Sequence, residues 1–569
     1  MPAKRPNRGG FKGDFKKLKR KQKAIQEGSP EEVLLADIRE LLAISADDAA
    51  AADVEPDAET LPAPGTEIEV DVFELSSNSD GLARQEGSRR IYAVPYTLPG
   101  DKVKVKVYKH LTEEQYSIAD FVAVTKPSAS RDDSRITCPY FTKCPGCQFQ
   151  MLEYADQLQL KKRMVEKAYR HFSDLPPGLV PRVLDTMGSP LQYSYRTKLT
   201  PHFDGPPRAR KGEPRKRLEA MPPVGFTSRQ RQVLDIEDCP IGTDAVRKGM
   251  TQERERLARE YGNYEKGATI LLRESTVRVP KTAEGQPGPV PDGVPVDAVT
   301  VEGDSYVDYK TCITDNNATS TEYIDDFVFT NPAGAFFQNN NSILSPFTAY
   351  IREHILPPSA PPSAAGAKPI RNLIDAYSGS GLFTITLSSL FATQGGGSTG
   401  IDIADKSIAF ARRNAALNGL DEAHCRFIAA DAPELFRSVA AYDPDETVVV
   451  LDPPRKGCDA GFLRQLLAFG PRRVVYVSCN VHTQARDVGV LVRGEIQTDR
   501  LEGQKSKAAA GSADEASGPT TESIEGQNAN DQRKKTRYEI ESLRGFDFFP
   551  QTGHVEGVAV LNRVVEQVE

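Results

Sequence analysis

The stretch Arg371-Asn-Leu-Ile-Asp-Ala-Tyr-Ser-Gly-Ser-Gly-Leu-Phe383 decides the fold, because an apolar strand runs directly into a turn with two glycines. Gly379 and Gly381 allow the backbone to approach a ligand closely. About 20 residues further on, Gly400-Ile-Asp-Ile-Ala places Asp402 at the end of the next predicted strand. An acid at that point can bind the ribose hydroxyls of a nucleoside-containing cofactor.

The chain from residue 331 to residue 569 alternates apolar strands with helical patterns, which predicts a Rossmann-like α/β domain with a parallel sheet. Its glycine spacing differs from the G-x-G-x-x-G of dinucleotide sites, and nothing in the turn predicts a pyrophosphate cradle. The pattern therefore favours S-adenosylmethionine over NAD. A fourth strand, Val448–Leu451, delivers Asp452 to a rigid Pro-Pro turn. Asp431 follows the third strand and fits either a contact to the adenine or a helix N-cap.

Two further segments supply reactive side chains. Val474-Val-Tyr-Val-Ser-Cys479 ends a strand on a thiol, and Phe549-Pro-Gln-Thr-Gly-His-Val-Glu556 leads into the last strand. Methylation at carbon 5 of uracil needs a thiolate that adds to carbon 6, a methyl donor, and a base that removes the carbon-5 proton. Cys479, Glu556 and the predicted cofactor pocket fill these roles. The residue after the Pro-Pro turn is Arg455 rather than an aromatic, which argues against methylation of an amino group.

The first half of the chain has a different character. Residues 1–60 predict a disordered tail whose first 23 residues carry ten Lys and Arg against one acid, Asp14, with one candidate helix over residues 31–44. Short alternating runs over residues 64–126 predict a small β-barrel, and residues 132–330 predict a central α+β domain. Residues 503–535 have the composition of a disordered insertion within the last domain. The net charge of −7 gives only weak evidence against a polyanionic partner, and no apolar stretch is long enough to predict a membrane span.

Eight cysteines in a chain without a predicted secretion signal favour metal binding or chemistry over disulfides. Cys138, Cys144 and Cys147 have C-x5-C-x2-C spacing, and Cys239 lies far downstream. Three close thiols and one remote thiol suit an iron–sulfur cluster, and zinc is the alternative.

These motifs together resemble the RNA uracil-5 methyltransferases, a class I family with a TRAM RNA-binding barrel. The resemblance covers residues 64–566 apart from the insertions, and its fungal members are the most similar. It rests on Phe336-Phe-Gln-Asn339, Asp375-Ala-Tyr-Ser-Gly-Ser-Gly381, Leu451-Asp-Pro-Pro-Arg-Lys-Gly457, Val477-Ser-Cys-Asn480 and the segment ending at Glu556.

The resemblance implies that Gln338, Tyr377, Asp402 and Asp452 bind S-adenosylmethionine, that Cys479 is the nucleophile and that Glu556 accepts the proton. The family usually has Glu at the position of Asp402, so we expect a longer or water-mediated ribose contact. Arg196, in Tyr195-Arg-Thr-Lys198, matches an element near the target base. The four cysteines of the cluster resemble the 4Fe–4S site of some bacterial members.

The family resemblance implies a tRNA substrate, with uridine 54 of the thymine loop as the target. We expect a monomer with no protein partner, located in the nucleus and cytoplasm, with a mitochondrial location left open. Two alternatives are the same chemistry on ribosomal RNA and an RNA-binding or RNA-folding protein whose catalysis is dispensable. The intact pair of Cys479 and Glu556 argues against the second alternative as the sole role.

Overall fold

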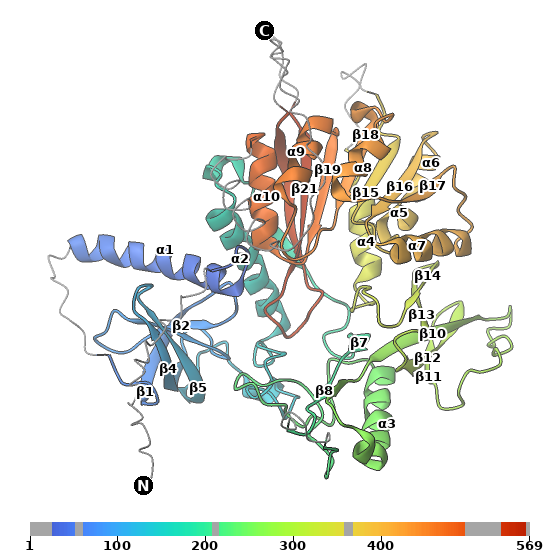
Figure 1. The fold of residues 1–569 in the computed structure, drawn as a ribbon. Coiled ribbons are helices and arrows are strands. Elements are labelled where there is room, and N and C mark those ends of the chain that lie inside the picture. Colours follow the sequence, from blue (N-terminus) through green and yellow to red (C-terminus); the bar gives the residue numbers. More distant parts are fainter. Residues whose placement is uncertain (1–24, 52–60, 208–215, 358–367, 496–535, 565–569) are drawn as a thin grey trace, which may run out of the picture.

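The computed structural model describes residues 25–51, 61–207, 216–357, 368–495 and 536–564, and Figure 1 shows a barrel, a central region and a large α/β layer. The predicted insertion over residues 503–535 lies outside the described residues. No described helix is long and apolar enough to cross a membrane.

Five strands near the N-terminus close into a barrel with the order β1-β2-β3-β5-β4. On β4, Val103, Val105 and Val107 are buried, while the lysines between them point outward, as the alternation in the sequence predicts. The barrel strands are β1 (Glu67–Leu75), β2 (Gly81–Arg84), β3 (Ile91–Val94), β4 (Lys102–Leu111) and β5 (Tyr116–Lys126).

Helix α1 (Pro30–Ala51) lies across the barrel (Figure 1), within the segment that the sequence predicted as a disordered tail. Leu34, Leu35 and Ile38 pack against apolar side chains of the barrel, and this burial orders a helix of which only residues 31–44 were expected. Residues 1–24 and 52–60 lie outside the described residues.

The central region contains a four-stranded sheet with the order β11-β12-β10-β7 and a hairpin of β13 and β14. Helix α3 packs against β10 and β12. The elements of the central region are β7 (Lys198–Leu199), β8 (His202–Phe203), α3 (Asp244–Glu260), β9 (Ala268–Thr269), β10 (Leu272–Pro280), β11 (Val299–Glu302), β12 (Tyr306–Ile313), β13 (Thr319–Ile324) and β14 (Phe327–Pro332).

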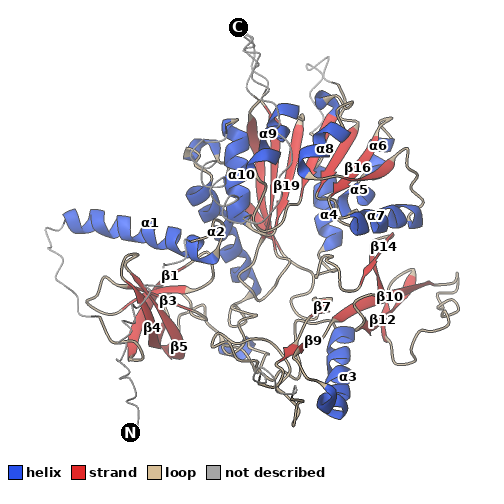
Figure 2. Cartoon of the chain, viewed as in Figure 1, coloured by secondary structure: helices blue, strands red, loops and turns tan. Residues whose placement is uncertain are grey.

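The large sheet has eight strands in the order β17-β16-β15-β18-β19-β21-β20-β6, and helices cover both of its faces (Figure 2). The pairs from β17 to β19 are parallel, whereas β21 runs antiparallel to β19 and β20. Its strands are β6 (Leu184–Met187), β15 (Asn372–Ala376), β16 (Gly397–Asp402), β17 (Cys425–Ala429), β18 (Thr447–Leu451), β19 (Arg473–Ser478), β20 (Tyr538–Phe546) and β21 (Glu556–Arg563).

Both faces of this sheet are apolar, which explains the uninterrupted hydrophobic runs of its central strands. On β18, Val449 and Leu451 belong to the core on one face, and Val448 and Val450 belong to the core on the other. The helices of this part are α4 (Leu344–His354), α5 (Leu382–Thr386), α6 (Ser388–Ala392), α7 (Asp405–Leu417), α8 (Ala432–Ser438), α9 (Ala460–Phe469) and α10 (Val481–Arg493).

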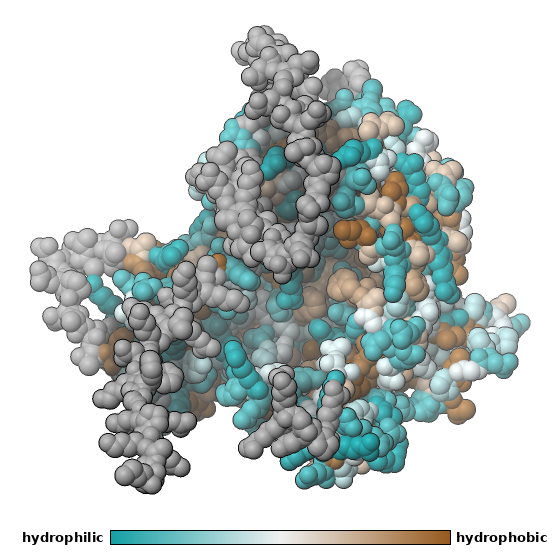
Figure 3. Space-filling view, viewed as in Figure 1, coloured by the Kyte–Doolittle hydropathy of each residue, from teal (hydrophilic) through white to brown (hydrophobic). Residues whose placement is uncertain are grey.

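The predicted α/β fold with an N-terminal barrel and an α+β centre is confirmed. One part of the α/β layer was not predicted. Helix α2 (Tyr154–Phe172) and strand β6 come from the segment that the sequence predicted as the central domain. Helix α2 packs against α10, and β6 pairs with β20 at the edge of the large sheet. On the visible face in Figure 3, hydrophilic residues predominate and hydrophobic residues form small patches between them.

Candidate active site

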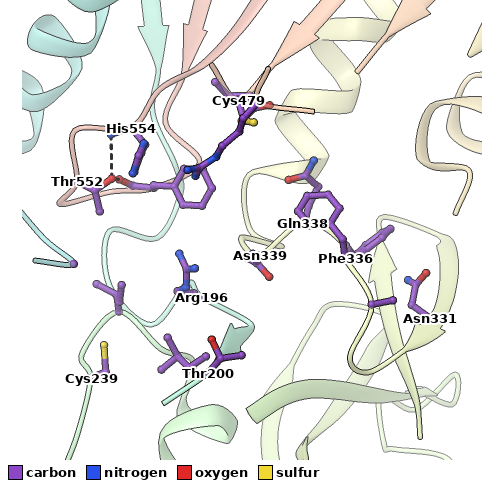
Figure 4. Close-up of a pocket in the computed structure, with 18 of the residues that line it drawn as sticks. Arg196, Thr200, Cys239, Asn331, Phe336, Gln338, Asn339, Cys479, Thr552 and His554 are labelled. Atoms are coloured by element: carbon purple, nitrogen blue, oxygen red, sulfur yellow. Dashed lines mark hydrogen bonds between the residues drawn. The ribbon is translucent and has the colours of Figure 1, made fainter. Parts of the chain in front are cut away.

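A cavity of about 1290 Å³ lies between the carboxyl ends of the large sheet's strands and the central region. Figure 4 shows side chains of both parts facing this space. It is large enough for a cofactor together with a nucleotide, since typical ligand pockets measure about 300–1000 Å³. The catalytic, cofactor-binding and cluster residues that the family resemblance implies all line it: Cys138, Cys144, Cys147, Cys239, Gln338, Tyr377, Asp402, Asp452, Cys479 and Glu556.

The glycine turn after β15 adopts a left-handed backbone. Tyr377, Gly379 and Gly381 have φ angles of 66°, 54° and 94°. A Cβ placed on Gly379 would meet nothing within 4 Å, so this backbone faces the open cavity. Asp402 fixes the turn, because its carboxylate accepts hydrogen bonds from the Gly379 N–H at 3.0 Å and from the Ala404 N–H at 2.8 Å.

A second carboxyl group, that of the buried Asp375, also stabilises this turn. Asp375 accepts hydrogen bonds from the backbone N–H and the hydroxyl of Thr384, at 3.0 and 2.6 Å. Burial raises the pKa of Asp375 to about 7, and the Thr384 hydrogen bonds oppose that rise. Asp431 does not reach the cavity: it is the N-cap of α8 and accepts from the Glu434 N–H, which is the second of the two expected roles.

We expect Gly381→Ala to weaken cofactor binding about tenfold. Its Cβ would lie 2.9 Å from the Phe427 ring, and alanine is disfavoured at a φ of 94°. Gly395→Ala is the matched control, since Gly395 also has a positive φ but its Cβ would meet nothing within 4 Å. Calorimetric titration with S-adenosylhomocysteine measures both, and equal affinities in the two variants would contradict the expectation.

Cys479 and Glu556 face each other across neighbouring strands. The register of β19 and β21 pairs Ser478 with Gly557, and one step further places Cys479 opposite Glu556 at the edge of the cavity. The Glu556 side chain is 3% exposed. Burial raises the pKa of Glu556 well above its ordinary value, the charge of Asp452 raises it further, and Arg455 opposes the rise.

The thiol of Cys479 lies in the same electrostatic environment. Burial and the negative charges of Glu556 and Asp452 raise the pKa of Cys479 to about 12, and Arg455 opposes this rise by its charge and a hydrogen bond. The next residue, Asn480, caps α10 and donates to the carbonyls of Arg455 and Gly28. Arg455 was noted in the sequence only for excluding another chemistry, and its role beside the thiol was missed because it depends on how the turn folds back.

Three more side chains complete the cavity wall. Arg196 lies over the Phe549 ring at 5.8 Å, and Phe336 is 76% exposed, which is unusual for an aromatic ring. His554 is exposed to the cavity although protein surrounds it on most sides, and burial together with the charge of Arg455 lowers the pKa of His554 to about 4. It is therefore a neutral imidazole near pH 7. Figure 4 places Arg196, Phe336 and His554 around the space next to Cys479.

The four cysteines of the predicted cluster gather on the central-region side of the cavity. Burial raises the pKa of each thiol, and for Cys144, Cys147 and Cys239 neighbouring thiols add to that rise. Within the ranges that the structure describes, however, no three His, Cys, Asp or Glu side chains are arranged to hold a metal ion. In this arrangement the thiols do not fit an iron–sulfur cluster or a zinc ion.

The order of the large sheet, the glycine turn after β15 and the acid at the end of β16 define a Rossmann-like class I methyltransferase. The TRAM domain family matches residues 63–122, and the tRNA (Uracil-5-)-methyltransferase family matches residues 318–498. The tRNA (uracil(54)-C(5))-methyltransferase of Schizosaccharomyces pombe is 39% identical over 550 residues, which cover 96% of this chain and 86% of that protein. The protein of the same name from Saccharomyces cerevisiae is 37% identical, with 87% of this chain and 73% of that protein covered.

The chain therefore belongs to the RNA uracil-5 methyltransferase family and is an enzyme, as the sequence predicted. The crystal structure of Pyrococcus abyssi tRNA (uracil-54, C5)-methyltransferase in complex with S-adenosyl-L-homocysteine has a TM-score of 0.53 and 21% identity. It matches 87% of this chain and 100% of its own, and it shows the same fold.

Proposed function

We propose that this enzyme methylates carbon 5 of uridine 54 in tRNA, with S-adenosylmethionine as the methyl donor. The observation that carries the proposal is the juxtaposition of Cys479 and Glu556 at one end of the cavity, with the glycine turn and Asp402 also lining it. The names of the two fungal relatives, which share 37% and 39% of their aligned residues with this chain, support the tRNA substrate and the nucleotide.

The residues of the cavity fit this cofactor. The open backbone at Gly379 leaves room for it, and Asp402, already held by two N–H groups, keeps lone pairs free for ribose hydroxyls. Gln338, Tyr377 and Asp452 would complete the binding site. When bound, S-adenosylmethionine would supply the methyl group from its positively charged sulfur and would leave as neutral S-adenosylhomocysteine. Asp402 is one methylene shorter than the Glu usual at this position, so its contact to the ribose would be longer or would pass through a water molecule.

The chain's own residues then account for the reaction. The Cys479 thiolate, favoured by Arg455, adds to carbon 6 of uracil and makes carbon 5 electron-rich. After the methyl group has joined carbon 5, the Glu556 carboxylate removes the remaining carbon-5 proton. The double bond re-forms, the bond from Cys479 to carbon 6 breaks, and the enzyme is released. The base must leave the RNA stack for both carbons to be reached, and the exposed Phe336 ring in the cavity can stack on it.

The test uses an unmodified tRNA transcript, the same transcript with cytidine at position 54, and a fragment of ribosomal RNA. We expect 5-methyluridine to form only in the first transcript. Product from the ribosomal fragment alone would keep the chemistry and assign the alternative substrate. Product from neither RNA would favour the alternative in which RNA binding or folding is the main role.

The cluster predicted at Cys138, Cys144, Cys147 and Cys239 is a separate proposal, supported by the gathering of the four thiols on one side of the cavity and opposed by their present arrangement. Iron and sulfide analysis of protein purified without oxygen decides it. About four of each per chain would establish a 4Fe–4S cluster. Stoichiometric zinc would establish the alternative, and metal-free, active protein would refute both.

We also propose a monomer located in the nucleus and cytoplasm, in line with the basic residues near the N-terminus. Light scattering of the purified protein and imaging of a tagged chain test these two points.

A further inference from the structure

The segment that joins β20 to β21, residues 547–555, is here called the base loop because it leads directly to Glu556 (red in Figure 1). Four other parts of the chain donate hydrogen bonds to four successive carbonyls of this loop. The Phe548 carbonyl accepts from Asn340, the Phe549 carbonyl from Lys161, the Pro550 carbonyl from Tyr195, and the Gln551 carbonyl from the N–H groups of Gln148 and Phe149. These hydrogen bonds fix the backbone of the base loop directly before Glu556.

Lys161, on α2, makes the strongest of these contacts. It is fully buried, and its ammonium donates to Asp547 at 2.5 Å and to the Phe549 carbonyl at 3.0 Å. Asp547 is also fully buried and accepts from the Phe549 N–H at 3.1 Å. The ion pair therefore fixes both the first residue of the base loop and the peptide two residues further on.

Stability alone does not explain this ion pair. The desolvation of two buried charges offsets most of their attraction, and an apolar pair of similar size is often equally stable. Burial lowers the pKa of Lys161, and the charge and the hydrogen bond of Asp547 oppose this fall. The hydrogen bonds of this ion pair fix the direction of the Asp547 carboxylate and of the Phe549 carbonyl, which an apolar pair would not contact.

A second contact from α2 holds the middle of the base loop. Gln157 lies one helical turn before Lys161, on the same face of α2. Its amide donates to the Gln551 side chain and accepts from the Gln551 N–H, both at 3.0 Å. Gln551 has a φ of 70°, which is unusual for a residue with a side chain, and this reciprocal pair holds it there.

The nucleophile is held by different elements. Cys479 follows β19, and its neighbours Ser478 and Asn480 bond to each other, to Arg455 and to Gly28. None of the contacts given above for Lys161 involves these residues. A change at Lys161 should therefore displace the base without displacing the thiol.

We propose that Lys161 is a positioning residue that acts through Asp547 and the base loop to set Glu556 for removal of the carbon-5 proton. The inference rests on the proposed function. Without Lys161, addition of Cys479 to carbon 6 and formation of the new carbon–methyl bond proceed. Breakage of the carbon-5–hydrogen bond, with transfer of its proton to Glu556, becomes slow. The methylated uracil then stays attached to Cys479.

The experiment compares Lys161→Met with Lys167→Met in the full-length protein. Lys167 is the matched control because it is also a buried lysine of α2, but it donates to the Leu75 carbonyl of the barrel. Two quantities are measured with tRNA that carries tritium at carbon 5 of its uridines: the release of tritium to water, and the amount of denaturation-resistant protein–RNA adduct. Melting temperature and cofactor affinity are measured alongside.

For Lys161→Met we expect tritium release to slow about 10- to 100-fold, as for a misplaced catalytic group, while adduct accumulates and cofactor affinity changes less than twofold. Lys167→Met should lower the melting temperature without accumulating adduct. Asp547→Asn, which keeps the acceptor for the Phe549 N–H but removes the ion pair, should accumulate adduct as well and serves if Lys161→Met does not fold.

Equal loss of adduct formation and tritium release in both ion-pair variants would overturn the inference, because it would assign Lys161 to folding alone. So would adduct accumulation in Lys167→Met to the same level. Wild-type enzyme with 5-fluorouridine tRNA separates the two proposals, since fluorine at carbon 5 prevents the last step. A wild type that forms no adduct with this RNA rejects the proposed function, whereas one that does leaves the result for Lys161 to stand by itself.

Discussion

Cys479→Ala is expected to abolish methylation, by at least about 10⁴-fold, because the reaction at carbon 5 cannot begin without a nucleophile at carbon 6. The substitution removes a half-buried thiol at the end of β19 and disturbs little else, since Asn480 still caps α10. Methyl transfer from radiolabelled S-adenosylmethionine to tRNA measures the effect, and the 5-fluorouridine adduct should disappear with it.

Cys312→Ala provides the control for the loss of a thiol. Cys312 lies on β12 and packs against Gly249 of α3, outside the cavity, so this variant should keep its activity. An adduct that survives in Cys479→Ala would contradict the assignment. It would direct attention to the other thiols that line the same cavity, those of Cys138, Cys144, Cys147 and Cys239.

The sequence was informative where function depends on residues that are close in the chain. The apolar strand before Gly379 and the acid at the end of the next strand predicted the cofactor half, and the structure joins them through the hydrogen bond from Gly379 to Asp402. The facing of Cys479 and Glu556 depends on a reversal that the parallel pattern does not predict. Glu556 begins β21, and only the antiparallel pairing of β21 with β19 brings it to the edge where β19 ends.

The contacts of the base loop could not be predicted from the sequence. Its partners Lys161 and Gln157 lie 386 and 394 residues away, and a lysine in a helical pattern is normally an exposed residue. The same holds for β6, four residues that join the edge of the large sheet from a distant segment. The ordering of α1 depends on the barrel surface that buries Ile38, and the sequence showed only a short candidate helix there.

The cysteine cluster shows a limit of prediction from spacing. Cys138 and Cys239 line one cavity although about a hundred residues separate them, so the fold brings the four cysteines to the same side of the molecule. Spacing does not determine the distances between sulfur atoms, however, and metal ligation requires these to be nearly fixed. The structure supports the gathering and not the ligation.

Glu556→Gln is expected to have the second largest effect, a slowing of turnover by about 10²–10⁴-fold, but with a different signature from Cys479→Ala. Glutamine has nearly the same shape and fills the same buried position, so Cys479 can still add to carbon 6 and the methyl group can still be accepted. The carbon-5 proton then has no acceptor. The product should accumulate as a methylated protein–RNA adduct that resists denaturation and carries label from S-adenosylmethionine, which gel electrophoresis measures directly.

The pH dependence of the wild type offers an independent test of the same base. Glu556 acts when it is deprotonated, and burial and Asp452 raise its pKa above the ordinary value for Glu, which is about 4.3. Tritium release should therefore fall as the pH falls through that raised pKa, at a higher pH than for an exposed carboxylate. Because the Cys479 thiolate is also lost as the pH falls, the release is measured from adduct that was formed at high pH and then transferred to lower pH. Glu539→Gln, an exposed residue of β20 in the same hairpin, should leave this profile unchanged. A Glu556→Gln enzyme that releases tritium at the wild-type rate would show that another group removes the proton, with neutral His554 as one candidate in the cavity wall.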